Sequence, residues 1–359
     1  MRKPVSHPDT PHLLKITADN KEDVANLITG RKNNELIFLL GSGASVEAGM
    51  PTVAQLTKEL KNSLPTLLDV NGVQRPEYGE VFDLFEKNSG WDAKNYEKFF
   101  EWINALLEVN KDAFRNVIHT KIAPLLIDAM GHLTSVIGAE VARLLSLRRT
   151  EPSYLARLSD FLPDEGRLKV FTLNYDCCVE DACRTAGIDV TTGFDPVTKR
   201  WNPSLFKKSC RGVNLYKLHS SLLWFPVSDN RRSRCKRTLM ELTPDESRQF
   251  STDPRILKCP ELILGPGPKV QSDDPFLTLL CEFRKAAQNA EQIIVIGFGN
   301  GDPHVKEIID DAIDIGVSIL NVNIQEPNGR YFGAARYRHL MSSAKDALLN
   351  GLIANKCFR

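Results

Sequence analysis

The segment Glu35–Thr52, ELIFLLGSGASVEAGMPT, joins an apolar run to a glycine-rich turn. The run Leu36–Leu40 is uniformly apolar, which is the pattern of a strand buried on both faces of a parallel sheet. Gly41 and Gly43 follow, and residues without a Cβ atom allow a sharp turn and a close approach of backbone to a ligand. A helical pattern resumes at Val53, so the turn is predicted to present backbone N–H groups and a helix N-terminus to a pyrophosphate. The spacing G-x-G-x5-G differs from the G-x-G-x-x-G of dehydrogenases, and a merely tight turn is the open alternative.

The composition is that of an ordinary globular chain. It has 359 residues, of which 42% are apolar and 25% are charged, with a net charge of +1. This balance provides no basic field that would attract nucleic acid, so direct nucleic-acid binding is not expected. No apolar run reaches the length of a membrane span, and the N-terminal sequence MRKPVSHPDTPH lacks the apolar core of a signal peptide. We therefore predict a cytoplasmic protein without a membrane partner.

The eight cysteines carry no metal-binding pattern. No two of them form a C-x-x-C pair, and no group of cysteine and histidine residues repeats the spacing of zinc ligands. Reduced thiols spread through core and surface account for this distribution. We expect no bound metal, and no zinc in particular.

Strands alternate with helices after the first unit, which is typical of an α/β fold with a doubly wound parallel sheet. The predicted strands are Leu168–Leu173, Ile188–Thr192, Val213–Leu218, Gln292–Ile296 and Val317–Val322. The predicted helices include Cys177–Ala186, Phe276–Asn289, Val305–Ile315 and Ala334–Ala354. The polar stretch over 228–256 is expected to be a surface loop.

Helical spacing without strand signals over about 54–160 predicts a helical insert that caps the glycine-rich turn. The expected organisation is an N-terminal arm and helix over 1–34, an α/β domain over 35–325 that contains the insert, and a C-terminal helical segment over 326–359.

Polar and glycine-rich clusters follow three of the predicted strands. They are Asn174-Tyr175-Asp176, His219-Ser220 and the segment Gly297–His304. Because the carboxyl ends of parallel strands lie at one edge of a sheet, where ligands bind in this class, the clusters are predicted to meet there with the glycine-rich turn.

In combination, these motifs resemble the sirtuin family and, within it, the zinc-less prokaryotic sirtuin-like domains of anti-phage systems that hydrolyse NAD. Four matching segments occur in order between about residues 35 and 322: Gly41–Thr52, Thr172–Asp176, Lys217–Trp224 and Ile296–His304. The resemblance implies that the domain is Rossmann-like and takes NAD+ as its substrate.

The resemblance also implies roles for individual residues. Asn174 and Asp176 would lie at the nicotinamide ribose and carboxamide, and His219 would be a general base near that ribose. The Gly41–Ser45 turn would hold the pyrophosphate, and the loop after Ile296 would line the adenosine side. The residues that it assigns to NAD+ binding are Gly41, Ser42, Gly43, Ala44, Ser45, Thr52, Thr172, Gly297, Phe298, Asp302 and His304.

Three departures from sirtuin deacetylases argue against peptide deacetylation. The four-cysteine zinc module of those enzymes has no counterpart here. Their glycine loop continues into Pro-Asp-Phe-Arg, where this chain has Pro51-Thr52-Val53-Ala54. Their catalytic histidine precedes glycine, whereas His219 precedes Ser220, and a positive φ at this serine would be costly.

The polar residues suit cleavage of the bond between nicotinamide and ribose. This reaction passes through an oxocarbenium-like state and releases nicotinamide as a neutral molecule, so it needs no general acid. Asn174 can position a water or a ribose hydroxyl without the cost of a buried charge. His219 can accept a proton near neutral pH, and Asp176 can hold the carboxamide or orient Asn174.

Structural roles are the alternatives at the same residues. Asn174 can form an Asx turn, and Asp176 can cap the helix that begins at Cys177. Asp302 followed by Pro303 is typical of a helix start, so His304 is expected to support the pocket and not to react.

The sequence thus predicts an NAD+ glycohydrolase that acts as an anti-phage effector once it is triggered. The expected trigger is assembly, as a homo-oligomer or with a partner: a HerA-type ATPase, or a short Argonaute as the alternative. A non-catalytic NAD or ADP-ribose sensor is the second hypothesis, and an NAD-dependent deacylase is the third. Preference for NAD over NADP is left open.

Overall fold

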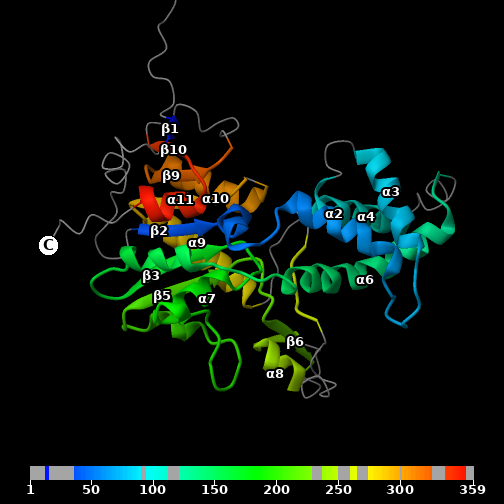
Figure 1. Ribbon diagram of the computed structural model, residues 1–359, viewed down its shortest axis with the longest axis horizontal. Coiled ribbons are helices and arrows are strands. Elements are labelled where there is room, and N and C mark those ends of the chain that lie inside the picture. Colours follow the sequence, from blue (N-terminus) through cyan, green and yellow to red (C-terminus); the bar gives the residue numbers. More distant parts are fainter. Residues whose placement is uncertain are drawn as a thin grey trace, which may run out of the picture.

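An eight-stranded parallel sheet organises the chain in the computed structural model, which describes residues 13–15, 36–89, 94–111, 121–228, 237–249, 259–264, 274–299, 301–325 and 336–352 (Figure 1). The strand order is β1-β10-β9-β8-β2-β3-β5-β4. The strands are β1 (Leu13–Lys15), β2 (Leu36–Leu40), β3 (Arg167–Thr172), β4 (Val190–Thr191), β5 (Gly212–Lys217), β8 (Gln292–Ile296), β9 (Ser318–Asn323) and β10 (Tyr337–Met341). The predicted doubly wound α/β sheet is confirmed.

Strand β2 lies in the middle of the sheet and is buried along its whole length. Successive side chains of a strand point to opposite faces, so Phe38 and Leu40 enter one hydrophobic core while Ile37 and Leu39 enter the other. This position between two cores explains why the run carries no polar residue.

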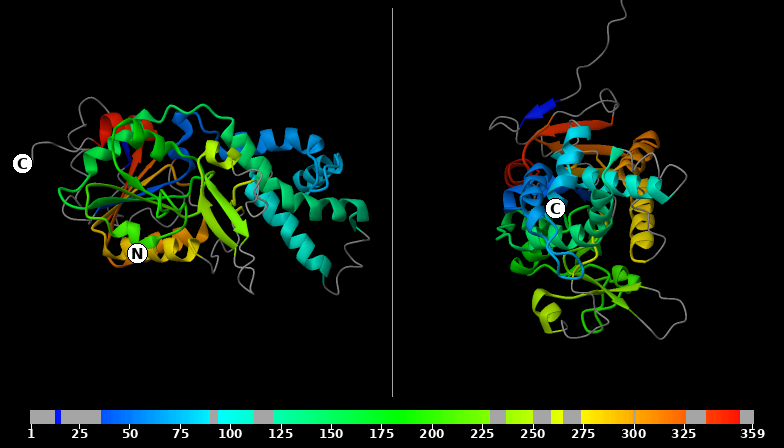
Figure 2. Two further views of the ribbon diagram at one scale, coloured as in Figure 1. Left: turned by 90° about the horizontal axis from the view of Figure 1, so that it is seen from below. Right: turned by 90° about the vertical axis from the view of Figure 1, so that its right-hand side faces the viewer.

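Helices cover both faces of the sheet (Figure 2). One face packs against α7 (Cys178–Thr185), the 3₁₀ segment η5 (Ser153–Phe161) and the π-helical turn η8 (Ala347–Gly351). The opposite face packs against α9 (Phe276–Asn289) and α10 (Pro303–Asp314). Short segments η6 (Pro203–Lys207) and α11 (Ala344–Asp346) lie in the connections.

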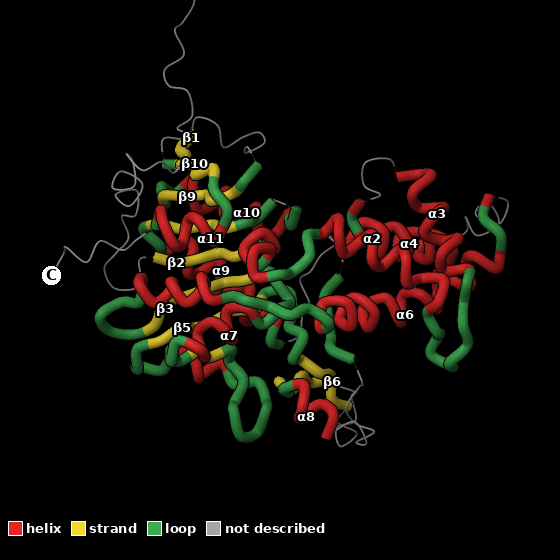
Figure 3. The backbone as a smooth tube through the Cα atoms, in the orientation of Figure 1, coloured by secondary structure: helices red, strands yellow, loops and turns green. Residues whose placement is uncertain are grey.

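In the described part of the chain between β2 and β3, four α-helices lie in the region of the predicted insert and extend beside the sheet as a separate arm (Figure 3). They are α2 (Val53–Ser63), α3 (Glu77–Ser89), α4 (Tyr96–Lys111) and α6 (Pro124–Ser146), with the 3₁₀ turn η3 (Leu64–Thr66) after α2. Phe82, Phe85 and Phe99 join α3 to α4 with ring centroids 4.6 to 5.8 Å apart. The insert therefore has an aromatic core of its own.

Helix α6 bears on the prediction that no apolar run reaches the length of a membrane span. Among the described helices it alone is long and apolar enough to cross a membrane by length and composition. In the structure it contacts α2, α3 and α4, and Met130, Leu133 and Ile137 are buried. Its apolar face is thus explained by packing within the insert.

Three segments differ from the predicted elements. The helix expected over Ala334–Ala354 gives way to β10, which pairs with β9, and helical turns begin only after Ser343. The loop expected over 228–256 contains β7 (Arg237–Glu241), paired with β6 (Trp224–Ser228), and the helix α8 (Pro244–Gln249). The arm over 1–34 contributes β1 to the sheet edge, whereas its predicted helix lies outside the described residues. Pairing with neighbouring strands decides these segments, and local residue patterns do not record it.

The sheet reverses its winding direction next to β2. After β2 the chain adds β3 and β5 on one side, and then crosses to β8, β9 and β10 on the other. From this point of the carboxyl edge the chain continues from β2 and from β8 toward helices that pack in different cores, α2 in one and α10 in the other. Ligands bind at such a point in α/β sheets of this type.

Candidate functional site

A cavity of about 350 Å³ lies at this switch point. Loops after β2, β3, β5 and β8 form its base, and the starts of α2 and α4 in the insert form a wall. The lining residues are Gly41, Ser42, Met50, Pro51, Val53, Leu56, Asn95, Tyr96, Glu97, Lys98, Leu145, Leu173, Asn174, Tyr175, Asp176, His219, Phe298, Gly299, Gly301 and Asp302.

The glycine-rich turn is built differently from the predicted strand-turn-helix. Two 3₁₀ turns, η1 (Ser42–Ala44) and η2 (Val46–Ala48), separate β2 from α2. The amides of Gly41 and Gly43 donate to the carbonyls of Ile296 and Gly297, at 2.9 and 3.0 Å. The next two amides donate within the turn, so the exposed Ser42 is its main polar contribution to the cavity.

The glycines allow the loops after β2 and β8 to touch. A Cβ atom on Gly41 would lie 2.6 Å from the Gly297 carbonyl oxygen, and one on Gly43 would lie 2.8 Å from the Gly297 Cα. Gly297 has a φ of +67° and would bring a Cβ atom to 2.3 Å from the Ala44 nitrogen. The turn thus needs glycine for contact between loops as well as for any approach to a ligand.

Asn174 joins two of these loops. Its Nδ2 donates to the Gly41 carbonyl at 2.9 Å and to Ser45 Oγ at 3.0 Å, while its backbone amide donates to Thr172 Oγ1 at 3.1 Å. Both side-chain bonds use the amide nitrogen. The carbonyl oxygen Oδ1 remains as the acceptor that the side chain brings to the cavity it lines.

Asp176 has a structural contact and also lines the cavity. Its Oδ1 accepts from the Cys178 amide at 2.9 Å, at the first residue of α7. The carboxylate is therefore tied to the N-terminus of the helix, where the helix dipole favours negative charge. The N-cap of α7 is Cys177 and not Asp176, so the predicted capping role is wrong, while Asp176 contacts the start of the helix and also lines the cavity.

His219 and Asp302 form a buried pair, with 2.7 Å between His219 Nε2 and Asp302 Oδ2. The other carboxylate oxygen, Oδ1, accepts from the His304 and Val305 amides at 2.9 and 3.0 Å and caps α10. An ionised carboxylate can only accept, so His219 Nε2 carries the hydrogen and Nδ1 is the basic nitrogen of this tautomer. Asp302, predicted to lie on the adenosine side, is thus the residue that orients His219.

Ser220 has the left-handed conformation that the sequence identified as costly. Its φ is +95°, it is fully buried, and its hydroxyl donates to the Glu261 carbonyl. The serine occupies a backbone conformation that glycine adopts without strain, and the hydrogen bond holds it in place.

Tyr96 and Tyr175 are cavity residues that the sequence reasoning missed as site candidates. The Tyr175 hydroxyl donates to the Ile263 carbonyl at 2.6 Å and is hydrogen-bonded to Tyr96. Burial raises the pKa of both phenols well above the usual value, so they remain neutral donors. The motif Asn174-Tyr175-Asp176 was a signal for Tyr175, whereas no local pattern marked Tyr96.

The remaining predicted residues are not among those that line the cavity. The Ala44 carbonyl accepts from the Tyr154 hydroxyl, and Thr52 caps α2 through a reciprocal pair with Gln55. Thr172 supports the Asn174 amide, as described above. His304 borders a smaller hollow on the other side of His219 and Asp302. The structure therefore brings Gly41, Ser42, Asn174, Asp176, His219, Phe298 and Asp302 together in the cavity.

The environment of the two thiols beside the Asn174 motif favours their protonated form. Burial, followed by nearby carboxylates, raises the pKa of Cys177 and Cys178 far above the usual value. Within the described ranges, no group of three or more His, Cys, Asp or Glu side chains is arranged to hold a metal ion.

Residues 168–318, which are less than half of the chain, match a family described as a SIR2-like domain. No curated protein matches the chain. Similar solved structures include "Crystal structure of a Sir2 homolog–NAD complex", at 16% identity over 96% of this chain and 95% of that chain with a TM-score of 0.43. Another is "Structural Basis for the Mechanism and Regulation of Sir2 Enzymes", at 13% identity over 94% and 96% with a TM-score of 0.45. Over residues 168–318 the chain is therefore similar to a SIR2-like domain.

Proposed function

We propose that this chain is an NAD+ glycohydrolase that releases nicotinamide and ADP-ribose. The observation that carries the proposal is one cavity at the sheet switch point that contains Asn174, Asp176 and the His219–Asp302 pair. The SIR2-like match over 168–318 includes all four residues.

The proposed chemistry assigns one task to each side chain. Asn174 Oδ1 accepts from a water or a ribose hydroxyl, and its amide nitrogen stays bonded to the glycine-rich turn. Asp176 accepts from the nicotinamide carboxamide. His219 takes a proton from the attacking water or a ribose hydroxyl, and the Asp302 carboxylate stabilises the imidazolium that forms.

The test is NAD+ consumption with chromatography of nicotinamide and ADP-ribose, in the absence of any acylated peptide. Asn174→Ala and His219→Ala are each expected to lower turnover by about 10²–10⁴-fold. His132→Ala is the matched control, because this histidine pairs with Asp128 on α6 and does not line the cavity. NAD+ binding without turnover under every condition would instead support the sensor hypothesis.

We also propose that the activity serves anti-phage defence and is triggered by assembly into a homo-oligomer or with a partner, of which a HerA-type ATPase is preferred over a short Argonaute. The support is the sequence resemblance alone. Co-expression with neighbouring genes, followed by size-exclusion chromatography and measurement of cellular NAD+ during infection, tests this role. Unchanged NAD+ levels in infected cells that contain the complex would contradict it.

A further inference from the structure

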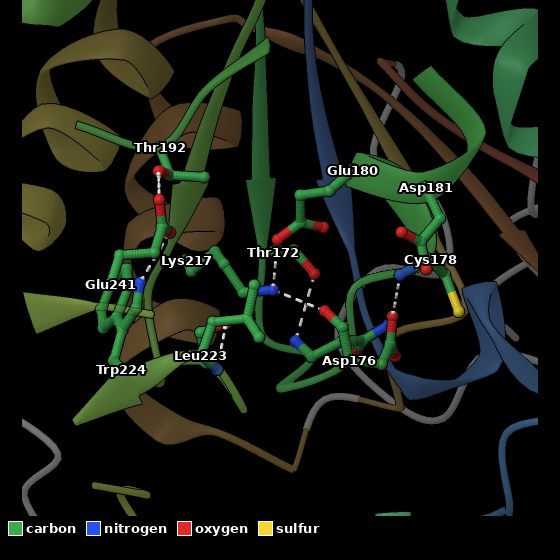
Figure 4. A network of polar contacts seen from close by, with 12 residues as sticks. Thr172, Asp176, Cys178, Glu180, Asp181, Thr192, Lys217, Leu223, Trp224 and Glu241 are labelled. Atoms are coloured by element: carbon green, nitrogen blue, oxygen red, sulfur yellow. Dashed lines mark hydrogen bonds and ion pairs between the residues drawn. The ribbon is translucent and has the colours of Figure 1, made fainter. Parts of the chain in front are cut away.

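Lys217 is fully buried and is the last residue of β5 (Figure 4). Its ammonium donates to the backbone carbonyl of Asp176 and, at 2.9 Å, to Glu180 Oε1. Both acceptors belong to the turn after β3 and the first turn of α7. The side chain of Lys217 on β5 therefore bonds to the segment that follows the neighbouring strand β3.

The ammonium remains charged in this position. Burial by itself disfavours the charged form, but the neighbouring carboxylate of Glu180 outweighs burial and raises the pKa of Lys217. Moving two charged groups out of water costs free energy. Well-packed apolar side chains of similar volume often stabilise a fold equally well.

The geometry of the chain links this contact to the reacting groups. His219 is two residues beyond Lys217, while Asn174 is two residues before the carbonyl that Lys217 holds. The distance between the His219 imidazole and the turn Asn174–Asp176 thus depends on the contact between the end of β5 and the segment that follows β3. Thr172 and Lys217 are paired at the ends of β3 and β5. The Lys217 side chain adds a contact to Asp176, beyond the last paired residues.

We propose that Lys217, through Asp176 O and Glu180, is a positioning residue that holds Asn174 and Asp176 in register with His219. This inference rests on the proposed function for its effect on turnover. The contact itself is a property of the folded chain and can be tested without NAD+.

The experiment compares Lys217→Met, the double variant Lys217→Met/Glu180→Leu, and Arg167→Met. The single variant leaves Glu180 without its ammonium and is expected to lose stability, so the double variant is the decisive one. Arg167→Met is the matched control, because Arg167 is also buried and donates to Asp189, Asn214 and Val213 at the opposite end of β3.

The double variant is expected to keep a melting temperature and an NAD+ Kd near those of the wild type, while kcat falls by about 100-fold through misplacement of the reacting groups. Hydrogen exchange of the Asn174 and Cys178 amides, which bond to Thr172 and Asp176, is expected to become faster. Arg167→Met is expected to lower the melting temperature and to leave both readouts unchanged.

Wild-type kcat in a folded double variant, or unchanged exchange at these amides, would overturn the proposal. A wild-type protein that binds but never hydrolyses NAD+ would contradict the proposed function instead. In that case the exchange measurement alone decides whether Lys217 holds the turn.

Discussion

Several residues of the site perform a structural and a chemical task with different atoms. Asp302 caps α10 with Oδ1 and holds His219 with Oδ2. Asn174 secures the glycine-rich turn with Nδ2, which leaves Oδ1 for the cavity. Removal of such a residue changes position and chemistry together, so conservative variants are needed to separate the two.

Ser220 offers a direct measure of backbone strain beside His219. Ser220→Ala is expected to lower the free energy of unfolding by about 1–2 kcal/mol, because the Glu261 carbonyl loses a donor. Ser220→Gly is expected to be about 0.5–1 kcal/mol more stable than the alanine variant, because glycine tolerates a positive φ. Urea unfolding of both variants measures this difference, and equal stability would mean that the position is not strained.

The buried carboxyl group of Glu241 is expected to make the free energy of unfolding depend on pH. Burial raises the pKa of its carboxyl group, while Thr192 Oγ1 and Trp224 Nε1 donate to it. A raised carboxyl pKa means that the ionised form costs stability at neutral pH, and that this cost disappears as the pH falls through the folded-state pKa. Glu241→Gln is therefore expected to be more stable than wild type at pH 7, with a difference that shrinks toward acid pH. A difference that grows toward acid pH would contradict this assignment.

At the scale of elements, the loops after β2 and β8 act as one unit. The Gly41 and Gly43 amides bond across to the β8 side, and glycines on both sides make the contact possible. These loops carry Ser42 from one half of the sheet and Phe298 from the other into the cavity. Their separation determines the width of the site at the switch point.

Gly297→Ala is expected to lower the free energy of unfolding by about 2–5 kcal/mol, from overpacking against Ala44 and from the positive φ. Gly299→Ala is the matched control, because a Cβ atom there meets no other atom within 4 Å. Thermal unfolding of the two variants tests the contact. Similar losses at both positions would show that loop contact is not the cause.

At the scale of the whole molecule, the cavity needs both halves of the sheet and the insert. Asn95, Tyr96 and Lys98 of the insert face the loops that follow β3 and β8. A ligand bound there would contact three parts of the chain that are remote in sequence. Ligand binding would then stabilise the contact between the insert and the loops of the sheet.

NAD+ at 100 times its Kd is expected to stabilise the His219→Ala variant by about 2.7 kcal/mol, provided that this variant retains affinity. Hydrogen exchange is expected to slow in segment 95–98 of the insert as well as at residues 173–176 and 298–299. Protection of the sheet loops without protection of segment 95–98 would show that the insert is not part of the NAD+ site.

Local sequence patterns were enough to predict the central strands and the helices between them. The apolar run at Ile293–Ile296 is that of a buried strand, and Phe276–Asn289 has the spacing of an amphipathic helix. Asn174, Asp176 and His219 were predicted as site residues because polar residues after buried strands stand out locally, and the structure brings them together in one cavity. Three features appear only in the folded chain: Tyr337–Met341 is a strand, Asp302 is hydrogen-bonded to His219, and Tyr96 lines the cavity. The physical reason is range: side-chain periodicity records the local environment, whereas strand pairing and contacts between residues 83 positions apart arise only when the sheet assembles.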